Sequence, residues 1–171
     1  AWDGSVRLFK LESADVPDPP PLRLLEGEGA ALCVSLNRSG DLLAVGSMSG
    51  MVRIWNLRQT NFPVLTKRGS EGAVMSLAFS PDSKALAAGG VSGNIRIWND
   101  LSTEDPGRNL AGHTGGVIAL AFSPDNHRIA SGSWDGTLRL WNLTEPAGGA
   151  VVLHEQIEMM SAVAFSLDGK V

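Results

Sequence analysis

Cysteine is almost absent from this chain of 171 residues, with Cys33 as its one instance. A single thiol cannot form an internal disulfide framework, so the composition fits a reducing compartment and predicts a cytoplasmic location. Long apolar runs are missing as well. No stretch approaches the roughly 18 consecutive apolar residues that a membrane-spanning helix requires. The sequence therefore predicts a protein without a membrane partner.

The patterns of several chemical sites are also missing. The histidines His113, His127 and His154 and the thiol of Cys33 lack the spacing of metal ligands, so we predict no metal site. Neither a Walker loop nor a strand–GxGxxG–helix unit occurs, and we expect no cofactor. The formal net charge of −4 disfavours a broad basic surface, so nucleic acid is not an expected partner.

What the chain does contain is a repeat. One four-residue pattern occurs four times, as VRLF at 6–9, VRIW at 52–55, IRIW at 95–98 and LRLW at 138–141. A second pattern occurs at intervals of 43 residues, as LNRS at 36–39, FSPD at 79–82, FSPD at 122–125 and FSLD at 165–168. A repeat of this length indicates that the chain builds one small unit several times and stacks the copies.

Residues 113–143 hold the clearest copy of this unit. Its predicted elements are strands over 117–122, 128–133 and 138–143, a turn over 123–126 and a hairpin over 134–137. We expect Asp135-Gly136 to supply the positive φ values of a two-residue hairpin loop. Outer strands are predicted over 63–67 and 151–155. Each unit is then a four-stranded antiparallel sheet, and such sheets bury both faces when they stack radially as a propeller.

These patterns resemble the WD-repeat family of β-propellers over essentially the whole chain. The family's repeat starts near Gly-His and ends in Trp-Asp. Here Gly112-His113 supplies the first pair, and Trp55, Trp98 and Trp141 end their repeats, each followed by asparagine. The amino-acid sequence of residues 121–143 is most similar to that of bacterial members. The resemblance implies an all-β fold: a β-propeller of four-stranded antiparallel blades, with about four blades' worth in this chain, within a seven- or eight-bladed ring.

The repeat also suggests how the chain is organised. We expect residues 1–171 to form one propeller segment, with repeats ending near Phe9, Trp55, Trp98 and Trp141 and a partial repeat over 144–171. By phase, the chain begins at a hairpin before a third strand and stops where a second strand should begin. We therefore expect a fragment of a longer propeller, whose ring is completed by missing sequence or by a second copy of the chain.

The WD-repeat family often carries a hydrogen-bonded tetrad of His, Ser or Thr, Asp and Trp. The resemblance places this structural tetrad at His113, Ser131, Asp135 and Trp141. A buried imidazole and a buried indole N–H both need partners, which such a network supplies. A Ser-His-Asp set can also indicate a catalytic triad. However, no oxyanion hole or nucleophile elbow is visible around Ser131.

The preceding repeat lacks this tetrad. The period gives Ser70, Ala88, Ser92 and Trp98 at the four positions. One repeat earlier still, the period gives Gly27, Val45, Ser49 and Trp55. We therefore expect both blades to be held by packing alone, and the blade around Trp141 to be the most rigid.

The resemblance also implies where a partner would bind. In this family the loops before the first strand and the hairpins between the second and third strands lie on one face of the disc, and loops on a rigid scaffold often carry recognition. The candidate partner-binding residues are the apolar Trp2, Met48, Val91 and Trp134, with polar contacts from Arg68, Glu71 and Thr114. The alternative role for Trp134 is to fold over its neighbouring loop.

We predict a non-catalytic interaction scaffold or sensor module that binds a protein or peptide on the propeller face. One alternative is a regulatory C-terminal segment of a larger bacterial kinase or NTPase. A second is an enzyme with a site facing the channel, for which the sequence offers no convergent acid–base pair. Fold by itself does not decide between these functions.

Overall fold

The computed structural model describes residues 5–8, 22–25, 30–59, 64–103, 105–145, 149–155 and 160–169. Phe9, expected to end the first repeat, lies outside the described residues. Within the described ranges every regular element is a β-strand, which confirms the all-β prediction. None of the described residues forms a helix long and apolar enough to cross a membrane.

Most strands of this described part form four-stranded antiparallel sheets. The first contains β3 (Ala31–Leu36), β4 (Leu42–Ser47), β5 (Met51–Asn56) and β6 (Val64–Arg68). The second contains β7 (Val74–Phe79), β8 (Leu86–Gly90), β9 (Ile95–Trp98) and β10 (Arg108–Leu110). The third contains β11 (Val117–Phe122), β12 (Arg128–Ser133), β13 (Thr137–Asn142) and β14 (Ala150–Glu155). A separate pair joins β1 (Val6–Leu8) to β2 (Leu22–Leu25).

Each sheet is a meander, since its strands pair in the order in which they occur along the chain. The predicted strands over 117–122 and 128–133 have the expected bounds, and the third strand of that unit begins one residue earlier than predicted. The turn between the first two strands is built from side chains. Ser123 Oγ donates to Asp125 and accepts from the Arg128 N–H, and Asn126 takes a φ of 62°.

The hairpin between β12 and β13 differs from the prediction. Its loop has three residues, 134–136, closed by a bond from the Gly136 N–H to the Ser133 carbonyl. Gly136 has a φ of +77°, whereas Asp135 is not among the described residues with positive φ. A turn followed by one left-handed glycine is the geometry of a three-residue hairpin loop. The prediction of a two-residue loop was therefore wrong. The N–H and the hydroxyl of Thr137 both donate to the Asp135 carboxylate in this three-residue loop.

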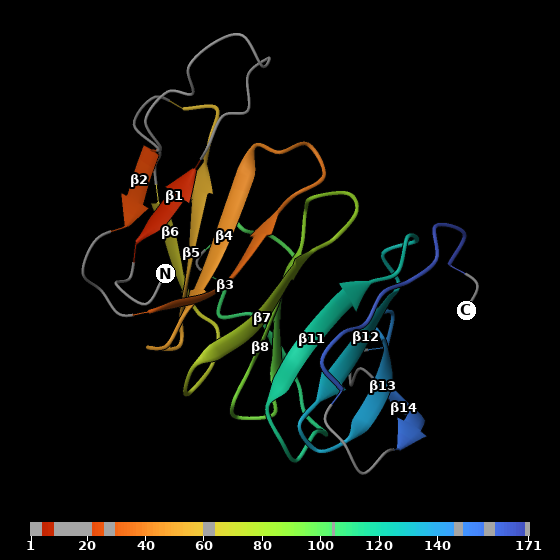
Figure 1. The fold of residues 1–171 in the computed structure, drawn as a ribbon. Helices are drawn as coiled ribbons and strands as arrows, with labels where there is room; N and C mark the ends of the chain where they lie inside the picture. Colours follow the sequence, from red (N-terminus) through yellow and green to blue (C-terminus); the bar gives the residue numbers. More distant parts are fainter. Residues whose placement is uncertain are drawn as a thin grey trace, which may run out of the picture.

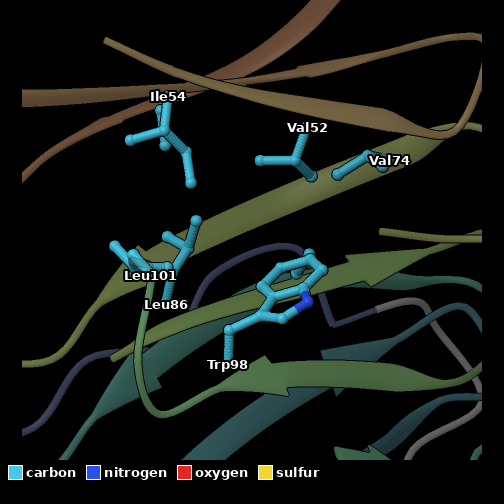
Figure 2. Close-up of a cluster of buried hydrophobic side chains, with 8 residues drawn as sticks. Val52, Ile54, Val74, Leu86, Trp98 and Leu101 are labelled. Atoms are coloured by element: carbon cyan, nitrogen blue, oxygen red, sulfur yellow. The ribbon is translucent and has the colours of Figure 1, made fainter. Parts of the chain in front are cut away.

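The core lies between successive sheets (Figure 2). Val52 and Ile54 of the first sheet face Leu86 and Trp98 of the second, and all four are at most 2% exposed. The opposite face of the second sheet packs on the third in the same way, in a cluster that contains Ile95, Ile97, Leu110, Val117, Ile129 and Trp141. The middle sheet is therefore buried on both faces, as a propeller blade requires.

Glycines let neighbouring sheets approach closely along their second strands. A β-carbon added at Gly46 would lie 2.5 Å from Val74 Cγ1, and one added at Gly89 would lie 2.6 Å from Val117 Cγ1. The innermost strands are also joined by side chains, because the Ser76 hydroxyl donates to the Val117 carbonyl at 3.1 Å. These contacts repeat with the 43-residue period, so the period of the sequence is also the period of the packing.

The sheets follow one another as a fan in Figure 1. At one end Val6 of β1 packs against Leu43, Val45 and Trp55 of the first four-stranded sheet. At the other end residues 160–169 lie against the third sheet, where a β-carbon on Gly132 would meet the Met160 carbonyl oxygen at 2.6 Å. Met160 thus takes the place that Val74 and Val117 have in the preceding repeats. Together these elements confirm the predicted fold of stacked four-stranded blades.

Candidate functional site

The structure brings together the four side chains of the predicted tetrad in the third sheet. Trp141 Nε1 donates to Ser131 Oγ at 2.7 Å, and Ser131 Oγ lies 2.7 Å from His113 Nε2. On the other side of the ring, His113 Nδ1 lies 2.9 Å from Asp135 Oδ2. Because Asp135 is an acceptor, the proton of a neutral His113 belongs on Nδ1, and Ser131 donates to Nε2.

Asp135 receives several hydrogen bonds within this network. The Thr114 N–H donates to its Oδ2, and both the N–H and the hydroxyl of Thr137 donate to Oδ1. Partial burial raises the pKa of this carboxyl. The bonds from Thr137, Thr114 and His113 outweigh that effect and hold the pKa well below its usual range. Asp135 therefore stays ionised and keeps His113 oriented.

Thr137 is a further member of this network, outside the predicted tetrad. Its hydroxyl oxygen lies 3.0 Å from His113 Nδ1 and accepts a bond from Arg139 Nε at 3.2 Å. The sequence pattern that indicates this role is a Ser or Thr two positions after the hairpin aspartate, because its hydroxyl can donate to the carboxylate of that aspartate. The network is thus larger than a tetrad.

The geometry argues against catalysis by His113, Ser131 and Asp135. Ser131 is fully buried, and its oxygen already accepts the indole N–H of Trp141. A nucleophile must reach the substrate carbonyl, and Ser131 cannot do so without opening the sheet. The same contacts suit a structural role, because they satisfy a buried imidazole and a buried indole at once.

The pKa of His113 is lowered, chiefly because burial disfavours the charged imidazolium, although the bond to Asp135 acts in the opposite direction. Below the unfolded pKa of about 6.5, the unfolded chain therefore binds more protons than the folded chain. The stability that neutral His113 contributes is present above that pH and is lost as the pH falls. We expect the free energy of unfolding, measured by urea denaturation, to decline from pH 7.5 to pH 5.5.

A matched pair of variants tests this pH dependence. His113→Gln should make the free energy of unfolding less dependent on pH. His127→Gln, in an exposed turn, should give the same dependence on pH as the parent chain. Equal slopes for both variants would mean that His113 does not cause the pH dependence.

The second sheet corrects one expectation. Ser70 Oγ and Ser92 Oγ, which occupy the positions of His113 and Asp135, lie 3.2 Å apart and share a hydrogen bond. In the first sheet the Ser47 and Ser49 hydroxyls lie 2.8 Å apart within their hairpin. The prediction that packing alone holds the second blade was therefore wrong, because two small hydroxyls can bridge the same gap directly.

The apolar residues predicted at the hairpin tips are exposed on the structure. Met48 is 52% exposed, Val91 39% and Trp134 47%. Each lies two positions before the glycine of its hairpin, which is Gly50, Gly93 or Gly136. These hairpins join the second and third strands of each sheet, so they lie at the opposite end from the turns after β3, β7 and β11. Trp2 lies outside the described residues. We call the surface formed by Met48, Val91 and Trp134, with Arg68, Glu71 and Thr114, the hairpin-tip face.

The hairpin-tip face is supported from beneath by loops. A β-carbon at Gly116 would lie 2.7 Å from the Trp134 ring, and one at Gly72 would lie 2.5 Å from Val91 Cγ2. Trp134 thus folds over its neighbouring loop and also keeps much of its surface in solvent. The polar candidates Arg68, Glu71 and Thr114 are exposed, and the Thr114 N–H is anchored on Asp135. The face is therefore a largely fixed surface with apolar and charged groups.

Other chemistry is not gathered in the described ranges. No group of three His, Cys, Asp or Glu side chains is arranged there as metal ligands would be. Cys33 lies between two sheets, with its thiol 3.5 Å from the Val74 carbonyl oxygen. Burial raises the pKa of this thiol to about 12, so Cys33 is protonated at neutral pH and is a poor nucleophile.

Comparison with protein families gives two matches. Residues 104–142 match the model of the WD domain, G-beta repeat, and these residues include the His113 network. Residues 26–114 match the model of the Vps8 β-propeller. No curated protein matches the chain significantly.

Proposed function

On the premise that this chain belongs to the WD-repeat β-propeller family, as its matches to the WD-domain and Vps8 β-propeller models show, we propose that its hairpin-tip face binds a protein or peptide. Propellers of this family generally mediate protein–protein interactions and are typically non-catalytic scaffolds. The observation that carries the proposal is the exposure of Met48, Val91 and Trp134 at equivalent positions of successive hairpins. Large apolar side chains repeated on one surface are typical of interaction sites.

The support beneath these residues favours binding. The N–H groups of Gly69 and Ser70 donate to the Gly50 carbonyl, which ties the hairpin of the first sheet to the segment that leads into the second. A side chain that is already held in place loses little conformational entropy when a partner covers it. Arg68 and Glu71 lie on the same face and can position charged groups of either sign at its rim.

Two exposed apolar residues allow a direct test of this site. Trp134→Ala should weaken the capture of a peptide selected from a random library on the parent chain by roughly tenfold, as expected for an interface anchor. Leu65→Ala, the matched control at a residue that is 45% exposed on the outer strand β6, should leave the affinity unchanged. Both variants should still unfold cooperatively, with a melting temperature within about 8 °C of the parent chain, which shows that a loss of affinity is not a loss of fold.

If selected peptides bind the Trp134→Ala variant as tightly as the parent chain, the hairpin-tip face is not the binding site. Competition among peptides from independent selections would then locate the surface that they do share.

We also propose that further blades extend the fan, supplied by additional sequence of a longer propeller or by a second copy of the chain. The support is the face of the third sheet that points away from the second sheet. Leu138 and Leu140 are partly exposed there, whereas Ile95 and Ile97, at the equivalent positions of the second sheet, are 0% and 2% exposed. Val151 beside Leu140 is 60% exposed. A neighbouring sheet would cover these side chains as the third sheet covers Ile95 and Ile97.

Three other proposals rest on the sequence. The single cysteine supports a cytoplasmic location. The resemblance of residues 121–143 to bacterial members of the family supports a bacterial source. The net charge of −4 supports a partner that is neither nucleic acid nor an anionic membrane surface.

A further inference from the structure

The ends of the sheets opposite to the hairpin-tip face carry a second surface with defined structure. It is formed by the turns after β3, β7 and β11 and by the turn at 166–169, which lie along one side of the fan (Figure 1). The turns contact one another: the Asp82 N–H donates to Asn126 Oδ1 at 3.4 Å, and Arg128 Nη2 donates to the Gly169 carbonyl at 3.5 Å. Neighbouring repeats therefore hold this surface together.

A hollow of about 460 Å³ opens on this surface. Its walls contain equivalent residues of four successive turns, spaced 43 positions apart, namely Arg38, Pro81, Pro124 and Leu167. Phe122 of β11, Phe165 and Ser166 complete the lining. Leu167 is fully exposed at the rim. The volume lies in the range of pockets that hold small ligands.

Arg38 is the odd member of this periodic set, because the other three turns place proline or leucine there. Among the described residues that line the hollow, it is also the single charged side chain. The carboxylates of the neighbouring turns accept hydrogen bonds from serines of their own turns. Ser80 donates to Asp82, Ser123 to Asp125, and Ser166 to Asp168. The hollow therefore combines an apolar lining with one cation at its edge.

We propose that this hollow binds an extended peptide segment that inserts an apolar side chain between the proline and phenylalanine residues and places a carboxylate on Arg38. Charge complementarity identifies the second group, since an arginine guanidinium recognises a carboxylate with two parallel hydrogen bonds. Burial of the apolar side chain supplies most of the affinity, and the ion pair sets orientation and preference. The site is separate from the hairpin-tip face.

Small probes test both halves of the proposal by nuclear magnetic resonance. Titration with N-acetyl-leucyl-leucine should shift the signals of the Leu167 methyls and the Phe165 ring. The same dipeptide as its C-terminal amide, which lacks the carboxylate, should bind about fivefold more weakly, as expected for a solvent-exposed ion pair. N-acetyl-diglycine, which keeps the carboxylate and lacks the apolar groups, should give no saturable shifts.

Variants assign the carboxylate to its partner. Arg38→Gln should reduce the affinity for the acid to that for the amide and leave the amide unaffected. Arg58→Gln is the matched control, because Arg58 pairs with Asp41 outside the hollow, and it should keep the preference of the parent chain. Shifts located elsewhere, equal affinities for acid and amide, or a preference that survives Arg38→Gln would each overturn the proposal. None of these outcomes bears on the hairpin-tip face, which Trp134→Ala tests.

Discussion

Replacing Trp98 by alanine is expected to lower the free energy of unfolding by about 3–5 kcal/mol, the range for removing a large aromatic side chain from a packed core. Trp98 is 1% exposed and closes the cluster between the first and second sheets, where it lies with Val52, Ile54 and Leu86 (Figure 2). Its loss would leave a cavity between two blades and remove contacts that join them. Single domains have total stabilities of only about 5–15 kcal/mol, so the variant should be close to unfolding.

The same substitution at Trp134 is the matched control for Trp98→Ala. Trp134 is 47% exposed, and its replacement should cost about 1–2 kcal/mol, since about half of its surface stays in water. Urea denaturation followed by circular dichroism measures both variants. Costs that agree within about 1 kcal/mol would contradict the burial of Trp98 between two sheets.

The second large effect is expected at Ser131. Replacing it by alanine should cost about 2–4 kcal/mol, because each buried polar group left without a partner costs about 1–3 kcal/mol and two such groups lose theirs. These groups are the indole N–H of Trp141 and Nε2 of His113, both 2.7 Å from the Ser131 oxygen. The small side chain of Ser131 therefore contributes to stability out of proportion to its size.

Ser76→Ala provides the comparison for Ser131→Ala. Ser76 is also buried, but its hydroxyl makes one bond, to the Val117 carbonyl, so its loss should cost about 1 kcal/mol. Denaturation curves of the two variants and the parent chain give the difference. If Ser131→Ala costs no more than Ser76→Ala, the His113 network does not stabilise its blade in the way described.

Much of the fold could be predicted because repetition supplies several examples of one unit. The strands β11 and β12 have the predicted bounds, since turns that contain Gly, Pro or Asp flank each of these six-residue segments. The structure also places His113, Ser131, Asp135 and Trp141 within hydrogen-bond distance of one another. The tetrad occurs in one repeat of the described chain, so its positions came from the resemblance to the WD-repeat family and not from the repetition itself.

Other features could not be predicted, because they depend on contacts between residues far apart in the sequence. The bond between Ser70 and Ser92 joins two loops, and neither residue has a sequence pattern of its own. The conformation of Asp135 depends on the side chains that surround its carboxylate, whereas the Asp-Gly pair by itself suggests a two-residue loop. The hollow beside Arg38 requires four turns to be placed together, and the spacing alone does not give its depth.

The central claim is that each repeat forms a sheet whose two faces pack on different neighbours. Proton–proton cross-relaxation in solution tests this most directly at the second sheet. The account predicts cross-peaks on both sides of it, from the Gly46 α-protons to the Val74 methyls and from the Gly89 α-protons to the Val117 methyls. Cross-peaks on one side alone, as in a two-layer sandwich, would contradict radial stacking of the blades.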